Sequence, residues 1–124
     1  MDTSINILIV DDFSTIRRIL KNILKDLGFK NLVEADDGST AWTILENQQM
    51  DLIIADWNMP ELTGLELLKK VRGSDHHKDV PFLMVTAEGQ KEQVIDAIQS
   101  GVTNYLIKPF TAAAISGKLE KILK

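Results

Sequence analysis

Ile5-Asn6-Ile7-Leu8-Ile9-Val10-Asp11-Asp12 is the stretch that decides the fold class of this chain. Its first six residues are nearly all apolar and mostly β-branched, without the alternation of a strand that has one face in water. Such a run is typical of a strand buried on both faces of a parallel sheet. Similar short runs recur along the chain, at residues 32–33, 52–55, 82–85 and 105–107.

Segments with helical spacing separate these runs. In the first segment the apolar residues share one helical face: Phe13, Ile16, Leu20, Ile23, Leu24 and Leu27. Gly28 follows them as the expected end of that helix. Thr63 and Glu66 have the spacing of a capping box at the start of a later helix. Thr111 suits the N-cap of the last helix.

The expected elements alternate strictly between strands and helices. The strands are expected at 5–10, 31–35, 51–55, 80–86 and 103–107, and the helices at 13–27, 38–47, 63–72, 90–100 and 111–123. This alternation predicts an α/β fold, a three-layer (βα)5 sandwich around a five-stranded parallel sheet with right-handed crossovers. No linker or shift in composition divides residues 1–124, so we expect one domain.

Composition narrows the classes of function. The 124 residues include 14 basic and 18 acidic ones, which argues against nucleic acid as a partner because phosphate binding needs a clustered basic surface. The absence of cysteine excludes disulfide frameworks, thiolate metal sites and thiol catalysis. No apolar run approaches the roughly 20 residues of a membrane-spanning helix, and no signal peptide is evident, so we expect a cytoplasmic protein without membrane insertion.

Polar residues follow four of the five apolar runs. Asp11 and Asp12 end the first run, Asp56 the third, Thr86 the fourth and Lys108 the fifth. In an open parallel sheet the carboxyl ends of the strands share one edge, and ligands bind there. Any one of these residues alone could be a strand-end cap in water, but together they favour a shared site.

The residue types at this edge suit phosphoryl chemistry. Carboxylates on strands about 4.8 Å apart repel one another unless they are protonated or bind a metal, and Mg²⁺ prefers oxygen ligands. An aspartate beside such an ion can attack a phosphoryl group, while the metal and Lys108 neutralise its charge and the Thr86 hydroxyl donates to one oxygen. The product would be an aspartyl phosphate.

Taken together, Asp11-Asp12, Asp56, Thr86-Ala87 and Lys108-Pro109-Phe110 resemble the receiver domain of two-component response regulators, over essentially the whole chain. Within that family, residues 10–15, 56–60 and 108–113 resemble the single-domain regulators of chemotaxis. The resemblance implies a flavodoxin-like fold with strand order 2-1-3-4-5, an order that the spacing of the runs does not provide.

The resemblance also implies roles for the polar residues. Asp56 would accept the phosphoryl group, which Thr86 and Lys108 would hold, and the Lys108–Pro109 peptide bond is expected to be cis. Asp12 and Asp56 would bind Mg²⁺ directly. The remaining contributions to the metal site would come from the main-chain carbonyl of Asn58 and, through water, from Asp11.

Further positions match the residues that regulate such a domain. Asn58 and Glu88 match the two positions that tune dephosphorylation, and Tyr105 matches the aromatic switch residue that moves with Thr86. We expect Ile95 and Ile98 of the fourth helix, together with Val102 after it, to face the core, with Val94 outside. The candidate partner surface consists of Val94, Tyr105, Ile107, Phe110 and Lys118.

The partners follow from the same resemblance. We expect a chemotaxis-type histidine kinase as phosphoryl donor, the flagellar motor switch protein as target, and a dedicated phosphatase as a further candidate partner. We expect a monomer. Since the chain stops after the fifth helix, we also expect no output domain and therefore action through a protein surface. The alternative is a single-domain receiver that serves as a phosphate sink or regulates another signalling protein.

Two other classes of function fit the residues less well. A flavodoxin-like electron carrier needs a Ser, Thr or Gly loop after the first strand, where Asp11-Asp12 would repel a phosphate. A hydrolase of external phosphoesters needs a nucleophile and an acid two residues apart, a pair that Asp11-Asp12-Phe13 lacks. We therefore expect a phosphoacceptor switch that catalyses only its own phosphorylation and dephosphorylation.

Two polar groups have simpler interpretations. His76 and His77 fall in a polar loop that we expect to be solvated. The basic residues of the first helix are expected to form a solvated face, with docking of an acidic partner as the alternative. They are Arg17, Arg18, Lys21 and Lys25.

Overall fold

The computed structural model describes residues 2–59, 61–87 and 91–123. The strands are β1 (Asn6–Val10), β2 (Asn31–Ala35), β3 (Leu52–Asp56), β4 (Phe82–Thr86) and β5 (Asn104–Ile107). The helices are α1 (Ser14–Asp26), α2 (Gly38–Asn47), α3 (Gly64–Arg72), α4 (Lys91–Gln99) and α5 (Ala112–Ile122). Within the described ranges, no helix combines the length and the apolar character that crossing a membrane would require.

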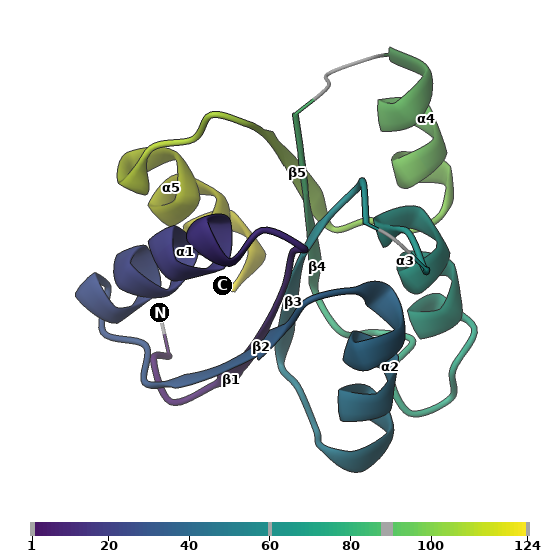
Figure 1. Ribbon diagram of the computed structural model, residues 1–124, viewed down its shortest axis with the longest axis horizontal. Coiled ribbons are helices and arrows are strands. Elements are labelled where there is room, and N and C mark those ends of the chain that lie inside the picture. Colours follow the sequence, from purple (N-terminus) through teal and green to yellow (C-terminus); the bar gives the residue numbers. More distant parts are fainter. Residues whose placement is uncertain (1, 60, 88–90, 124) are drawn as a thin grey trace.

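The five strands form one parallel sheet in the order β2-β1-β3-β4-β5. Helices α1 and α5 cover one face of the sheet, and α2, α3 and α4 cover the other (Figure 1). The three-layer fold and the strand order are therefore confirmed. β2 and α2 have the expected bounds, and the other elements differ from them by one or two residues at one or both ends.

Alternate residues of β1 explain why its apolar run is continuous. Ile7 and Ile9 pack into the core under α1 and α5, whereas Leu8 and Val10 pack into the core under α2 and α3. All four side chains are buried. Full burial of such a side chain contributes about 1.5–3 kcal/mol, so both faces of the strand must be apolar.

The expected helix ends are confirmed. Gly28 follows α1 with φ +102°, a left-handed conformation that favours glycine. At α3 the Glu66 amide donates to the Thr63 hydroxyl at 3.2 Å, and the Thr63 amide donates to the Glu66 carboxylate at 3.1 Å. At α5 the Ala114 amide donates to the Thr111 hydroxyl at 3.1 Å.

Three side chains expected on buried faces are exposed, and Val94, expected outside, is half-buried. Phe13 is the extended residue before α1, and because it is outside the helical face its side chain is 62% exposed. In α4 the buried side is formed by Ala97 and the half-buried Val94, while Ile95 and Ile98 are 41% and 59% exposed. The spacing of three residues places Val94 and Ala97 on one side of the helix, the side that faces Met84 and Thr86 of β4 across a small cavity.

The loop after α3 is also less solvated than expected. His77 is buried and contacts the Trp42 ring edge-on, with 6.1 Å between the ring centroids. Lys70 from α3 lies over the same Trp42 ring, with its Nζ 4.7 Å from the ring centroid. Through these two contacts, Trp42 joins α2 to α3 and to the loop, at the end of the sheet opposite to its carboxyl edge. His76 is exposed, as expected.

Candidate functional site

The carboxyl edge of the sheet brings three carboxylates together. Asp11 directly follows β1 and Asp56 ends β3, and Val10 is paired with Ala55 across the two strands. One carboxylate oxygen from each of Asp11, Asp12 and Asp56 lies within 4.8 Å of the others. Asp11 and Asp56 are buried, whereas Asp12 is exposed and opens the group to solvent.

Lys108 supplies a positive charge at the same place. It follows β5 directly, and its Nζ lies 3.0 Å from Asp11 Oδ2 and 3.3 Å from Asp56 Oδ1. Its amide donates to the Thr86 carbonyl at 2.7 Å, which continues the pairing of β4 and β5 to the edge of the sheet. The Lys108–Pro109 peptide bond is cis, as expected.

The charges of this acidic cluster (Asp11, Asp12, Asp56) are only partly balanced. Burial raises the pKa of Asp56 to about 6, assisted by the negative charge of Asp11 and opposed by Lys108. Burial alone would lower the pKa of Lys108, but its hydrogen bond to Asp11 and the charge of Asp56 raise it instead. Because three carboxylates face one ammonium group, the cluster favours the binding of a further cation. Its oxygen donors suit Mg²⁺.

Gly64, the first residue of α3, lies directly against the backbone of Asp56. A Cβ atom at this position would be 2.2 Å from the Asp56 carbonyl oxygen and 2.9 Å from Met84 Sδ. The Gly64 amide donates to the Trp57 carbonyl at 2.9 Å. Gly64 therefore lets α3 hold the end of β3. This role of Gly64 was not predicted from the sequence. The signal for it was a glycine, a poor helix former, directly after a strong helix cap.

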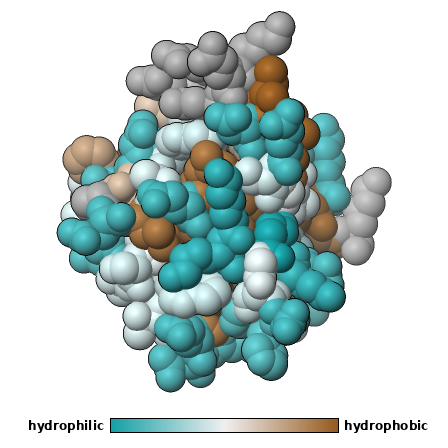
Figure 2. Space-filling view, turned by 90° about the vertical axis from the view of Figure 1, so that its right-hand side faces the viewer, coloured by the Kyte–Doolittle hydropathy of each residue, from teal (hydrophilic) through white to brown (hydrophobic). Residues whose placement is uncertain are grey.

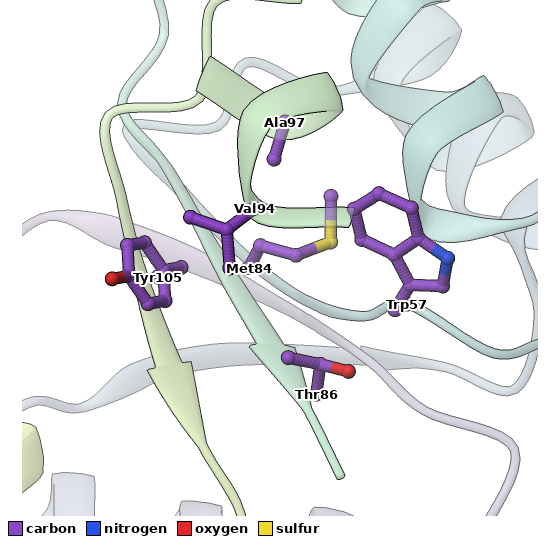
Figure 3. A pocket seen from close by; sticks show the side chains of 6 residues that line it. All are labelled: Trp57, Met84, Thr86, Val94, Ala97 and Tyr105. Atoms are coloured by element: carbon purple, nitrogen blue, oxygen red, sulfur yellow. The ribbon is translucent and has the colours of Figure 1, made fainter. Parts of the chain in front are cut away.

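A small cavity lies behind Thr86, on the α4 side of the sheet. Its volume is about 10 Å³, which is space for about one water molecule. Figure 3 shows that the lining side chains come from β4, β5, α4 and the turn after β3. They are Trp57, Met84, Thr86, Val94, Ala97 and Tyr105. Thr86 is buried and Tyr105 is half-buried, so the two predicted switch residues share one cavity.

The profile of the response regulator receiver domain matches residues 7–120. This chain belongs to that family. The receiver domain is 52% identical over 124 residues to the chemotaxis protein CheY-3 of Vibrio cholerae, an alignment that covers all of this chain and 95% of that protein. It is 54% identical over 118 residues to the chemotaxis protein CheY of Pseudomonas aeruginosa, with 95% of each chain covered.

Solved structures show the same fold. The chemotaxis protein CheY4 of Vibrio cholerae has a TM-score of 0.90 and 34% identity, covering 96% of this chain and 98% of that one. The receiver domain of a Pseudomonas aeruginosa sensor histidine kinase, with a magnesium ion coordinated in its active site cleft, has a TM-score of 0.87 and 27% identity. That match covers 97% of this chain and 98% of the other. The chain is thus a chemotaxis-type receiver domain of a two-component system, a signalling switch rather than a classical enzyme.

Of the two positions predicted to tune dephosphorylation, Asn58 lies within the described residues and Glu88 does not. Asn58 is exposed two residues after Asp56, in the turn that leads toward α3. Glu88 lies outside the described residues. Receiver domains bind Mg²⁺ at an acidic pocket, and the acidic cluster is the matching group in this receiver domain.

The five residues of the predicted partner surface do not form one continuous surface. Ile107 is 44% exposed on β5, and Lys118 Nζ lies 5.6 Å from the centroid of the Tyr105 ring and 3.2 Å from Asn104 Oδ1. Val94 instead lines the cavity. Phe110 packs on the other side of the sheet, against the core under α1 and α5.

Exposed apolar side chains on α4 were missed because both isoleucines were expected in the core. Ile95 and Ile98 are the residues concerned, and a helix whose apolar residues exceed one buried face was the available signal. Figure 2 faces α3 and α4 and shows hydrophobic side chains among the hydrophilic ones of this surface.

Proposed function

We propose that this receiver domain accepts a phosphoryl group on Asp56 from the phosphohistidine of a chemotaxis-type histidine kinase. The observation that carries the proposal is the position of Asp56, which is buried within the acidic cluster and 3.3 Å from Lys108. Similarity to chemotaxis proteins over the whole chain supports the class of donor.

The residues at this edge divide the work of the transfer. A carboxylate oxygen of Asp56 forms the new bond to phosphorus, and the bond between phosphorus and the imidazole nitrogen of the donor breaks. Because the pKa of Asp56 is about 6, its carboxylate is largely ionised at neutral pH and can act as the nucleophile. Lys108 remains protonated beside it and offsets charge on the phosphoryl oxygens.

We propose that Mg²⁺ binds at the acidic cluster, held by Asp12, Asp56 and the Asn58 main-chain carbonyl, with Asp11 acting through water. When bound, the ion would neutralise negative charge on the cluster and on the phosphoryl oxygens. The distances among the three carboxylates support this assignment. Dephosphorylation is proposed to occur at the same site, tuned by Asn58.

The output is proposed to be a change in affinity for a downstream protein, the flagellar motor switch. A phosphoryl group on Asp56 would attract the Thr86 hydroxyl, and Tyr105 would then occupy the space that Thr86 leaves in the shared cavity. That movement would alter the surface around Tyr105, Ile107 and Lys118. Coupling of this kind is typically worth about 1–3 kcal/mol, or roughly 5- to 150-fold in affinity.

Phosphorylation is tested by exposing the protein to a small acyl phosphate with Mg²⁺ and measuring intact mass. We expect one phosphoryl group on the wild type, none on Asp56→Asn, and one on Asp75→Asn, which removes an exposed carboxylate far from the site. Phosphorylation of Asp56→Asn to the same extent as the wild type would refute the assignment.

The target is tested by affinity for a motor-switch peptide with and without beryllofluoride, in the wild type and in Thr86→Ala. We expect enhancement in the wild type and little in Thr86→Ala. Equal enhancement in both would refute the Thr86-to-Tyr105 route. If Asp56 is phosphorylated and motor-switch affinity does not change, the protein acts as a phosphate sink or on another signalling protein.

A further inference from the structure

Arg17 of α1 contacts the backbone beside the acidic cluster. Its Nη1 donates to the Asp11 carbonyl oxygen at 2.5 Å, and its Nε donates to Glu34 Oε1 at 3.1 Å. Lys21, one turn further along α1, donates to Glu34 Oε2 at 3.1 Å. Glu34 lies on β2, the neighbour of β1 in the sheet. The guanidinium of Arg17 therefore links the end of β1 to β2, and Lys21 braces the same carboxylate.

The contact is made at the peptide group that joins Asp11 to Asp12. Because a peptide group is planar, fixing its carbonyl oxygen also fixes the direction in which the chain continues into Asp12. On the other side of Asp11, its amide donates to the Ala35 carbonyl at 3.1 Å. Its side chain accepts from the Phe13 amide at 2.9 Å. Arg17 completes a set of contacts that orients the turn carrying two of the three carboxylates.

Within α1 alone, the position of Arg17 is electrostatically unfavourable for a positive charge. It is the fourth residue of α1, near the positive end of the helix dipole, and the first turn of α1 has no acidic residue. The contacts with Glu34 and with the Asp11 carbonyl offset that cost. The next residue, Arg18, has the same charge but is exposed to solvent. The basic face of α1 is therefore not uniformly solvated, contrary to the expectation from the sequence.

We propose that Arg17 is a positioning residue for the divalent-cation site. Through the Asp11 carbonyl it holds the Asp11–Asp12 peptide so that the Asp12 carboxylate faces Asp56. This inference rests on the proposed function, because it takes the acidic cluster to be a Mg²⁺ site. Arg17 itself contacts neither the metal nor the phosphoryl group.

Whether an Arg17 substitution raises or lowers Mg²⁺ affinity distinguishes a positioning role of the side chain from a purely electrostatic one. Arg17 is a cation near a cation site, so loss of its charge alone would strengthen Mg²⁺ binding. Loss of positioning would weaken it. Loss of a residue that orients a metal ligand typically costs about 10- to 100-fold in affinity. Because Arg17 acts on the backbone next to the ligand, we expect about a three- to tenfold loss in Arg17→Ala.

The experiment is a Mg²⁺ titration followed by tryptophan fluorescence, since Trp57 adjoins Asp56. Arg18→Ala is the matched control, with the same loss of charge, and its affinity should be unchanged or slightly higher. Arg17→Lys keeps the charge but lacks the fork that reaches two acceptors, so its affinity should be as low as that of Arg17→Ala. Circular dichroism and thermal unfolding check that each variant is folded.

A second readout needs no metal. In the presence of a chelator, amide hydrogen exchange at Asp12 and Phe13 should be severalfold faster in Arg17→Ala than in Arg18→Ala. If both variants exchange alike at these amides, the positioning role is overturned even if Mg²⁺ affinity falls.

Asp12→Ala distinguishes the two levels of the proposal. If this variant loses Mg²⁺ affinity while Arg17→Ala binds as tightly as the wild type, the inference about Arg17 is overturned and the metal site is retained. If Asp12→Ala binds Mg²⁺ as the wild type does, the metal site is overturned, and the role of Arg17 with it.

Discussion

The acidic cluster and the cavity behind Thr86 are neighbouring regions built on opposite principles. In the cluster, buried carboxylates are held by Lys108 at 3.0 and 3.3 Å and by backbone contacts that leave no space. The cavity is lined mostly by apolar side chains and keeps a small unfilled volume. The cluster should therefore respond to changes in charge and backbone position, and the cavity to changes in side-chain volume. A phosphoryl group on Asp56 would connect the two.

The largest effect is expected where the cluster has no space. Gly64→Ala would place a methyl group 2.2 Å from the Asp56 carbonyl oxygen, so α3 or β3 must move. We expect the free energy of unfolding to fall by about 3 kcal/mol, measured by urea unfolding.

Gly117→Ala is the matched control for this substitution. Gly117 lies in α5, and a Cβ there meets no atom within 4 Å. This variant should be more stable than the wild type by up to about 1 kcal/mol, because alanine is the better helix former. Similar effects of both substitutions would contradict the tight packing of α3 against Asp56.

The next effect concerns charge in the cluster. The pKa of Asp56 is about 6 in the folded protein, against the ordinary value of 3.8 in the unfolded chain, so the folded state binds the proton more tightly. Stability is therefore lost as pH rises from about 4 to about 6, and the penalty persists above that range. Without divalent cations, Asp56→Asn should increase the free energy of unfolding by about 2–3 kcal/mol near pH 8.

The pH dependence of this gain provides its own control. Near pH 4 the Asp56 carboxyl is protonated in the folded protein, so Asp56→Asn and the wild type should be about equally stable there. Unfolding curves at several pH values measure the difference. A gain that did not change with pH would mean that the carboxylate is not the source of the penalty.

The smallest effect is expected in the cavity. Val94→Ala removes two methyl groups from its lining and should lower the free energy of unfolding by about 1–2 kcal/mol, with the same value near pH 5 and near pH 8. Ile98→Ala, on the exposed side of α4, should change it by less than about 0.5 kcal/mol. A clear pH dependence of the Val94→Ala effect would break the distinction between the two regions.

Much of the fold could be predicted from the sequence because local signals agreed with the global arrangement. The β-branched run before Asp11 indicated a doubly covered strand, and Thr63 with Glu66 marked a helix start that the structure confirms. The meeting of Asp11, Asp12 and Asp56 followed from the shared edge of parallel strands. The strand order came only from resemblance to a family, since the apolar runs do not determine which strands are neighbours.

The rest depended on packing that no local pattern encodes. Ile95, Ile98 and Val94 are similarly apolar, so only the side that α4 turns toward the sheet, marked by Val94 and Ala97 at the cavity, decides which of them is covered. The role of Arg17 depends on a carbonyl group six positions earlier in the chain and on a neighbouring strand.

The measurement that most directly tests the acidic cluster as a cation site is urea unfolding with and without Mg²⁺ near pH 8, for the wild type, Asp12→Ala and Asp75→Asn. A ligand that binds only the folded state adds about 2.7 kcal/mol at 100 times its dissociation constant. We predict stabilisation of this order for the wild type and Asp75→Asn, and little for Asp12→Ala. Equal stabilisation of all three proteins, or none of the wild type, would contradict the assignment.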